Sequence, residues 1–172
     1  DLDDGLQLGI RIIRLLPGWH GWTLQSPEFR QLLQTATPHR LLLQICLRLE
    51  DPRIQHSLLQ IPDVDPTPLL EADNRPADGP LQLLNALAST PLELAGRLAA
   101  EAGVGFEIAM LEGLAGLERL TRQLPPERLH FGSFAPVFTP HAAVLKLQES
   151  ELPRPLLDAI RKDNAATLLM PR

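Results

Sequence analysis

The 172-residue chain has a single cysteine, Cys46, so no disulfide can form within it. A lone thiol is typical of proteins from reducing compartments, and we expect a cytoplasmic protein. Basic residues are few and scattered, with 16 Lys and Arg against 21 Asp and Glu. The net charge of −5 argues against a nucleic-acid surface, because such surfaces need clustered positive charge. No apolar run approaches the roughly 18 residues of a membrane span, so we expect no membrane partner.

The sequence also lacks a secretory signal, an initiator Met and any known nucleotide-binding loop. No secretory signal opens the chain, and it begins Asp-Leu-Asp-Asp without an initiator Met, which suggests the middle of a longer chain. No Gly-x-Gly-x-x-Gly or Walker-type loop follows any expected strand, which weakens a nucleotide-binding function. Hydrophobic and charged contents of 44% and 22% are ordinary for a globular protein. Residues 1–172 are enough for one domain with a sizeable core.

Short apolar runs alternate with amphipathic stretches along the chain. We expect five strands, each followed by a helix, over residues 10–16, 41–47, 81–85, 104–110 and 128–131. The run 41–47 is apolar enough for burial on both faces, as in a parallel sheet. Ser26 and Pro27 mark the start of the first helix after a strand. Such βα units leave two architectures, an open doubly wound sheet or part of a (β/α)₈ barrel.

Four segments match a known family in the same order. Residues 131–136 read Phe-Gly-Ser-Phe-Ala-Pro, residues 14–22 read Arg-Leu-Leu-Pro-Gly-Trp-His-Gly-Trp, and residues 44–46 read Gln-Ile-Cys. The chain ends with Ala159-Ile160, Asn164-Ala165 and Leu168-Leu169. Together these segments resemble the C-terminal part of amidohydrolase-related, metal-dependent hydrolases, whose last strand ends in Phe-Gly-Ser-Asp-x-Pro.

The resemblance implies an α/β fold of the (β/α)₈ TIM-barrel type, here an N-terminally truncated portion with about five parallel strands and flanking helices. Residues 1–172 would form a single domain covering roughly strands four to eight. The implied activity is that of a hydrolase, or a related decarboxylase, acting on a small polar or anionic substrate at the C-terminal face of the barrel. A small-molecule substrate is therefore the expected partner. The sequence does not decide whether the protein forms a homo-oligomer.

Three positions depart from the ligands that bind metal in the family. Phe134 stands in place of the Asp on the last strand, and Cys46 and Leu16 stand in place of two His residues. Phenyl and alkyl groups do not bind divalent ions, although a thiolate binds zinc. We predict no metal site in this segment, and zinc or manganese would need ligands from a part of the barrel before Asp1. A non-catalytic binding or scaffold protein that has lost its metal site is the alternative function.

The densest polar cluster lies in residues 48–65, after the second expected strand. In a barrel this loop lies on the catalytic face. It offers an acid or base, carboxylates to orient it and arginines for an anionic substrate. The candidate catalytic residues are His56, Glu50 and Asp51, and the candidate substrate-binding residues are Arg48, Arg53 and Gln55. The alternative is that these charges pair with one another and brace an exposed loop.

His20 lies between Trp19 and Trp22 in the loop after the first strand. Imidazole exchanges protons near neutral pH, so His20 is a further candidate catalytic residue in a pocket walled by the two substrate-binding Trp rings. The alternative is that the rings pack the loop onto the barrel rim. Glu112 follows the fourth strand and either faces the site or caps the next helix. We expect Cys46 to be a small buried hydrophobe, and His130 and His141 to be structural or surface residues.

Overall fold

The computed structural model describes residues 2–76 and 79–169. Its sheet has five strands, and every neighbouring pair is parallel. The strands are β1 (Ile12–Leu15), β2 (Leu42–Cys46), β3 (Leu81–Leu84), β4 (Gly105–Glu107) and β5 (Leu129–His130). Their order in the sheet follows the sequence without the reversal that a doubly wound sheet requires. The described chain is therefore part of a (β/α) barrel.

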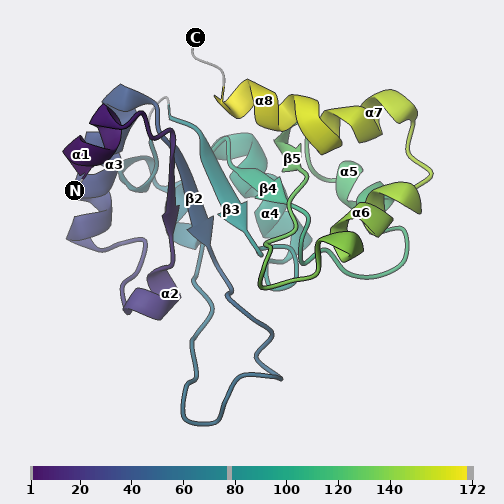
Figure 1. Cartoon of the computed structure of the whole chain (residues 1–172), viewed down its shortest axis with the longest axis horizontal. Coiled ribbons are helices and arrows are strands. Elements are labelled where there is room, and N and C mark those ends of the chain that lie inside the picture. The colour runs from purple at the N-terminus through teal and green to yellow at the C-terminus, as the bar shows by residue number, and fades with distance from the viewer. Residues whose placement is uncertain (1, 77–78, 170–172) are drawn as a thin grey trace.

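Helices connect and cover the strands (Figure 1). They are α1 (Leu2–Gln7), α2 (Pro17–His20), α3 (Pro27–Ala36), α4 (Leu92–Glu101), α5 (Gly116–Thr121), α6 (Pro140–Gln148), α7 (Arg154–Asp158) and α8 (Asn164–Leu169). Short 3₁₀ helices are η1 (Thr37–His39), η2 (Thr67–Leu70), η3 (Ala72–Asn74) and η4 (Pro126–Arg128), and η5 (Ala159–Asp163) is a π-helix between α7 and α8. Within the described residues, no helix has the length and apolar character needed to cross a membrane. In Figure 1 the arrows of β1 and β2 point toward the long loop of residues 48–65, and α8 lies at the opposite end of the sheet.

The strand register gives the sheet two different faces. One face packs against the helices and is fully apolar, with the completely buried side chains of Leu43, Ile45, Leu83, Phe106 and Leu129. The opposite face, which is the interior of a closed barrel, carries a row of polar residues instead. Arg14 on β1 lies beside Gln44 on β2, and Gln44 lies beside Gln82 on β3.

Helix α3 shows how local sequence fixes an element. The Ser26 hydroxyl accepts a hydrogen bond from the backbone N–H of Phe29 at 3.4 Å, which satisfies one of the free donors of the first turn. The predicted helix start at Ser26 is thus confirmed. Phe29, Leu33 and Ala36 recur on one side of the helix and are buried in the core.

Two strands differ from the sequence-based expectation. β1 was expected to be buried, yet its residues alternate between exposed and half-buried, because no described strand covers its outer edge. The fourth strand was expected over residues 104–110 but pairs only over Gly105–Glu107. The backbone N–H of Ala109 donates to the Glu107 carboxylate at 2.7 Å and so leaves the ladder of strand hydrogen bonds. The stretch at Trp19 and His20, expected as a loop, is part of the one-turn helix α2.

Candidate functional site

A cavity of about 270 Å³ lies on the interior face of the sheet, toward the carboxyl ends of the strands. Every strand or the loop after it contributes to the wall of this barrel cavity. Its lining comprises Arg14, Gln44, Gln82, Leu84, Glu107 and residues 131–135. Barrel enzymes carry their active sites at this end of the strands, so the barrel cavity is the candidate functional site.

A hydrogen-bonded ladder crosses one wall of the barrel cavity. Gln44 Oε1 accepts from Arg14 Nε at 3.1 Å and from Arg14 Nη2 at 3.0 Å, and Gln44 Nε2 donates to Gln82 Oε1 at 2.8 Å. A guanidinium only donates, so both amide groups have a forced orientation. The Nε2 group of Gln82, a residue only 5% exposed, is then left as a donor at the end of the ladder. The ladder thus presents donors to the cavity.

Arg14 also contacts Phe134, which stands where the resemblance described above predicts an Asp. The guanidinium carbon lies 5.7 Å from the centre of the Phe134 ring, within the range of a cation–π contact. Phe134 has a φ of 50°, and it lines the barrel cavity. None of the ion pairs among the described residues includes Arg14. The positive charge of Arg14 is therefore available to a ligand.

Glu107 supplies the opposite charge in the cavity wall. Its side chain is only 2% exposed, and its two carboxyl oxygens accept from the backbone N–H groups of Asn85 at 2.6 Å and Ala109 at 2.7 Å. Burial raises the pKa of Glu107, while these hydrogen bonds and the charges of Lys146 and Arg14 oppose the rise. The carboxyl group rests on Gly132, where an added Cβ would stand 2.6 Å from Oε2.

Lys146 of α6 holds the turn that follows Glu107. Its ammonium donates to the carbonyl of Ile108 at 3.0 Å and to the carbonyl of Ala109. Burial lowers the pKa of Lys146, and the charges of Glu107 and Glu112 act against that shift. The turn after Glu107 is thus held by the Glu107 carboxyl group, which accepts from the Ala109 N–H, and by Lys146, which donates to the carbonyls of Ile108 and Ala109.

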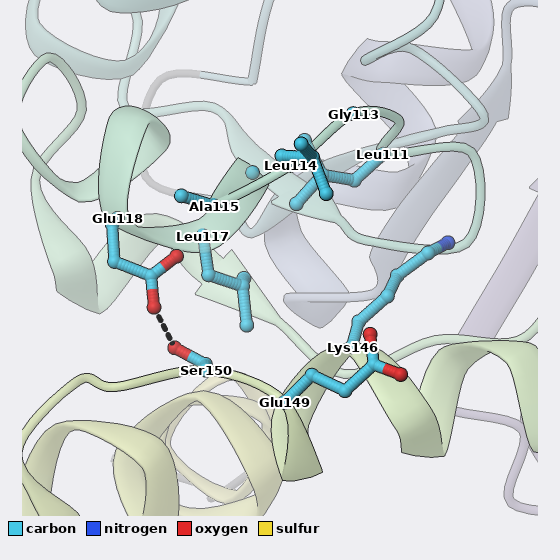
Figure 2. Close-up of a pocket in the computed structure, with 10 residues that line it drawn as sticks. Leu111, Gly113, Leu114, Ala115, Leu117, Glu118, Lys146, Glu149 and Ser150 are labelled. Carbon is cyan, nitrogen blue, oxygen red and sulfur yellow. Dashed lines mark hydrogen bonds between the residues drawn. The ribbon is translucent and has the colours of Figure 1, made fainter.

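A second hollow, of about 190 Å³, lies between α5 and α6. Figure 2 shows Leu117 and Glu118 facing Glu149 and Lys146 across it. The Glu118 carboxylate is already engaged, because it accepts from the Ser150 hydroxyl at 2.5 Å and from the backbone N–H of Glu151 at 2.8 Å. Lys146 donates to carbonyl groups as described above. The polar groups of this hollow are therefore largely used within the protein, unlike those of the barrel cavity.

The predicted site residues Arg48, Asp51 and Arg53 form ion pairs within the loop 48–65. Arg48 binds Asp63, with Nε donating to Oδ1 at 2.8 Å, and Arg53 pairs with Asp51. The Arg53 guanidinium lowers the pKa of Asp51 to about 2. These pairs brace the loop, as the alternative interpretation expected. None of the predicted site residues of this loop lines the barrel cavity.

Gln55 and His56 form hydrogen bonds within the same loop. Gln55 donates to the carbonyl of Ile61 at 3.1 Å and accepts from its N–H at 3.0 Å. Nδ1 of the exposed His56 accepts from the N–H of Leu58 at 3.2 Å. Glu50 is half-buried. Their catalytic and substrate-binding roles stay predictions.

The two Trp rings beside His20 have different surroundings. Trp22 stacks on Phe29, with ring centres 5.8 Å apart, and so packs against the core. Trp19 is 51% exposed and borders a narrow hollow with Leu16. His20 is exposed. Trp22 therefore anchors its loop, as in the alternative interpretation, and the barrel cavity is formed without either ring.

The donors on these strands do not fit a divalent metal. Cys46 is 3% exposed and its thiol donates to the Arg48 carbonyl at 3.2 Å. Burial raises the pKa of Cys46 to about 11, so the sulfur is a thiol rather than a metal-binding thiolate, in line with a small buried hydrophobe. Leu16 and Phe134 offer no ligand atom. Across residues 2–76 and 79–169, no group of three or more His, Cys, Asp or Glu side chains is placed to hold a metal ion.

The polar residues of the barrel cavity were missed as site candidates. Gln44 interrupts the run Leu-Leu-Leu-Gln-Ile-Cys-Leu, and Gln82 interrupts Leu-Gln-Leu-Leu. A single polar residue inside each of two buried strands is a signal for an interior polar row, because burying an amide without a partner is costly. The sequence shows these polar residues, but it does not show the strand register that places Arg14, Gln44 and Gln82 side by side.

The comparisons with known proteins support the barrel. No family model matches the chain, and no curated protein matches it. An uncharacterized TIM-barrel protein from Bordetella bronchiseptica is similar in structure, with a TM-score of 0.74 and 16% identity over 98% of this chain and 60% of that one. A "putative amidohydrolase" from Staphylococcus aureus has a TM-score of 0.66 and 11% identity over 95% of this chain and 66% of that one. The chain thus spans about two thirds or less of these proteins and is similar to them in fold, which the first of them names as a TIM barrel.

Proposed function

We propose that the chain forms the ligand-binding side of an amidohydrolase-like barrel and binds a small polar or anionic molecule in the barrel cavity. The observation that carries this proposal is the ladder of Arg14, Gln44 and Gln82, which turns hydrogen-bond donors toward the cavity. A ligand carboxylate would accept charge-assisted hydrogen bonds from the guanidinium, whose planar fork matches its geometry. The cavity volume suits a small molecule.

Acid–base catalysis is the second candidate function, and Glu107 favours it. A buried carboxyl group with a raised pKa in the wall of a cavity is typical of a general acid or base. In a hydrolase or related decarboxylase, Glu107 would hold or deliver the proton while Arg14 orients the substrate. His20, His56, Glu50 and Asp51 stay candidates for a role at the rim. No step is assigned to a metal, because the described residues do not fit one.

Replacing Arg14 by Met should remove the anion anchor. We expect the affinity of the intact protein for butyrate to fall at least tenfold, since a hydrogen bond to a charged group contributes about 1.5–3 kcal/mol. Isothermal titration calorimetry of both proteins, with the neutral amide butyramide as a second probe, measures this loss. Arg11→Met is the matched control, because Arg11 immediately precedes β1 and does not line the cavity.

Two results would contradict the proposal. One is butyrate binding that Arg14→Met leaves unchanged while the variant keeps its fold by circular dichroism. The other is equal affinity of the native protein for butyrate and butyramide, because a site built around a guanidinium must prefer the charged ligand.

A further inference from the structure

The barrel cavity carries opposite charges on opposite walls. Arg14 stands on β1 and Glu107 on β4, with Gln44 and Gln82 on the two strands between them. Neighbouring strands lie about 4.8 Å apart, so three intervals separate the two charged positions by roughly 14 Å at the backbone. The ion pairs among the described residues do not join Arg14 and Glu107. The two charges therefore face the same cavity without cancelling each other by contact.

Glu107 keeps capacity to accept hydrogen bonds from a ligand. An ionised carboxylate offers about four acceptor positions, and the N–H groups of Asn85 and Ala109 use one on each oxygen. Lys146 does not take the others, because its ammonium donates to the carbonyls of Ile108 and Ala109. The wall at β4 thus presents an acceptor that suits a donor on the ligand.

The other polar groups of the wall present donors. Gln44 connects its two neighbours, with Oε1 accepting from Arg14 and Nε2 donating to Gln82, and the ladder ends in the Nε2 group of Gln82. A ligand with a negative charge at both ends would place one of them against Glu107. A ligand with only a positive charge would meet the guanidinium of Arg14. Charge complementarity therefore favours a ligand that carries both charges.

We infer that the ligand is a small amino acid, whose carboxylate is bound by Arg14 and whose protonated amine is bound by Glu107. This inference rests on the proposed function, because it assigns the class of ligand for the same cavity. The amine would meet a buried carboxylate that has no ion-pair partner among the described residues, and the ligand carboxylate would meet the guanidinium of Arg14, which has none there either. The burial of Glu107 strengthens its attraction for the amine relative to an exposed site.

A series of unbranched ω-amino acids, from glycine to 6-aminohexanoate, tests the inference on the intact protein. Each is compared by calorimetry at pH 7 with the fatty acid and the alkylamine of the same chain length. At one length, where the ligand spans the two walls, the amino acid is expected to bind at least tenfold more tightly than either control. This comparison needs no variant, so it decides the matter even where a substitution disturbs folding.

Glu107→Gln refines the test, because it keeps the shape of the side chain and removes its charge. The variant should lose the preference for the amino acid over the fatty acid while its affinity for the fatty acid is kept or improved. Arg14→Met should weaken both ligands.

The possible results distinguish a failure of the inference from a failure of the proposed function. Fatty acids that bind as tightly as the amino acids at every length would overturn the inference and leave the proposed function standing. Alkylamines that bind as tightly as the amino acids would also overturn it, since Arg14 then contributes nothing. The absence of binding by every carboxylate in the series would overturn both.

Discussion

Gly105→Ala is expected to lower the free energy of unfolding by about 1–3 kcal/mol, the usual cost of overpacking a closed interior. Gly105 lies on the interior face of β4, against the His130 ring of β5. A Cβ at Gly105 would stand 3.0 Å from His130 Nδ1, closer still to Cε1, and 3.5 Å from the Leu81 carbonyl oxygen. His130 is 1% exposed, so its ring has no free space to enter. The clash outweighs the smaller gain in backbone entropy that Ala brings to a strand.

A double-mutant cycle in urea unfolding isolates this contact. In a His130→Ala background the ring is gone, and Gly105→Ala should cost much less than it does in the native chain. An equal cost in both backgrounds, or a Gly105→Ala variant as stable as the native protein, would show that the ring does not press on Gly105.

Acidification from pH 7 to pH 4 is expected to destabilise the fold by up to about 3 kcal/mol through His130 alone. Burial lowers the pKa of His130 to about 4, the positive charge of Arg128 acts in the same direction, and the nearby polar backbone of Phe106 opposes them. The unfolded chain has an ordinary His pKa of about 6.5 and therefore binds the proton first as the pH falls. Stability is complete above about pH 6.5 and is lost progressively toward pH 4.

The contribution of His130 is measured as a difference between two proteins. Urea unfolding from pH 4 to pH 8 is compared for the native chain and His130→Gln, which cannot titrate. Glu107 acts oppositely in both, because its raised pKa makes its contribution decline as the pH rises. We expect the native protein to lose about 3 kcal/mol more than the variant between pH 7 and pH 4. Parallel pH profiles would refute a buried neutral imidazole.

The strands were predictable because apolar runs dominate them. The run of residues 41–47 predicted β2 and its burial on both faces, and Ser26 predicted the start of α3. The end of β4 was not predictable from the run 104–110. There the Glu107 carboxylate captures the N–H of Ala109, an interaction that depends on the backbone folding back on its own side chain.

The candidate site was harder to predict, because density of charge is a poor guide to it. Arg48 and Arg53 stand out in the sequence, yet each binds a carboxylate of the same loop. The cavity depends on single polar residues, Arg14, Gln44 and Gln82, that lie far apart in the chain. Only the strand register brings them into one row.

The proposed function requires that the ladder of Arg14, Gln44 and Gln82 binds a small anion. Nuclear magnetic resonance of the intact protein during a titration with butyrate tests it directly. We expect saturable shifts at the Arg14 Nε–H signal and at the side-chain amides of Gln44 and Gln82, with none on addition of butyramide. Shifts confined to the loop 48–65, or signals of the ladder that do not move at saturating butyrate, would contradict it.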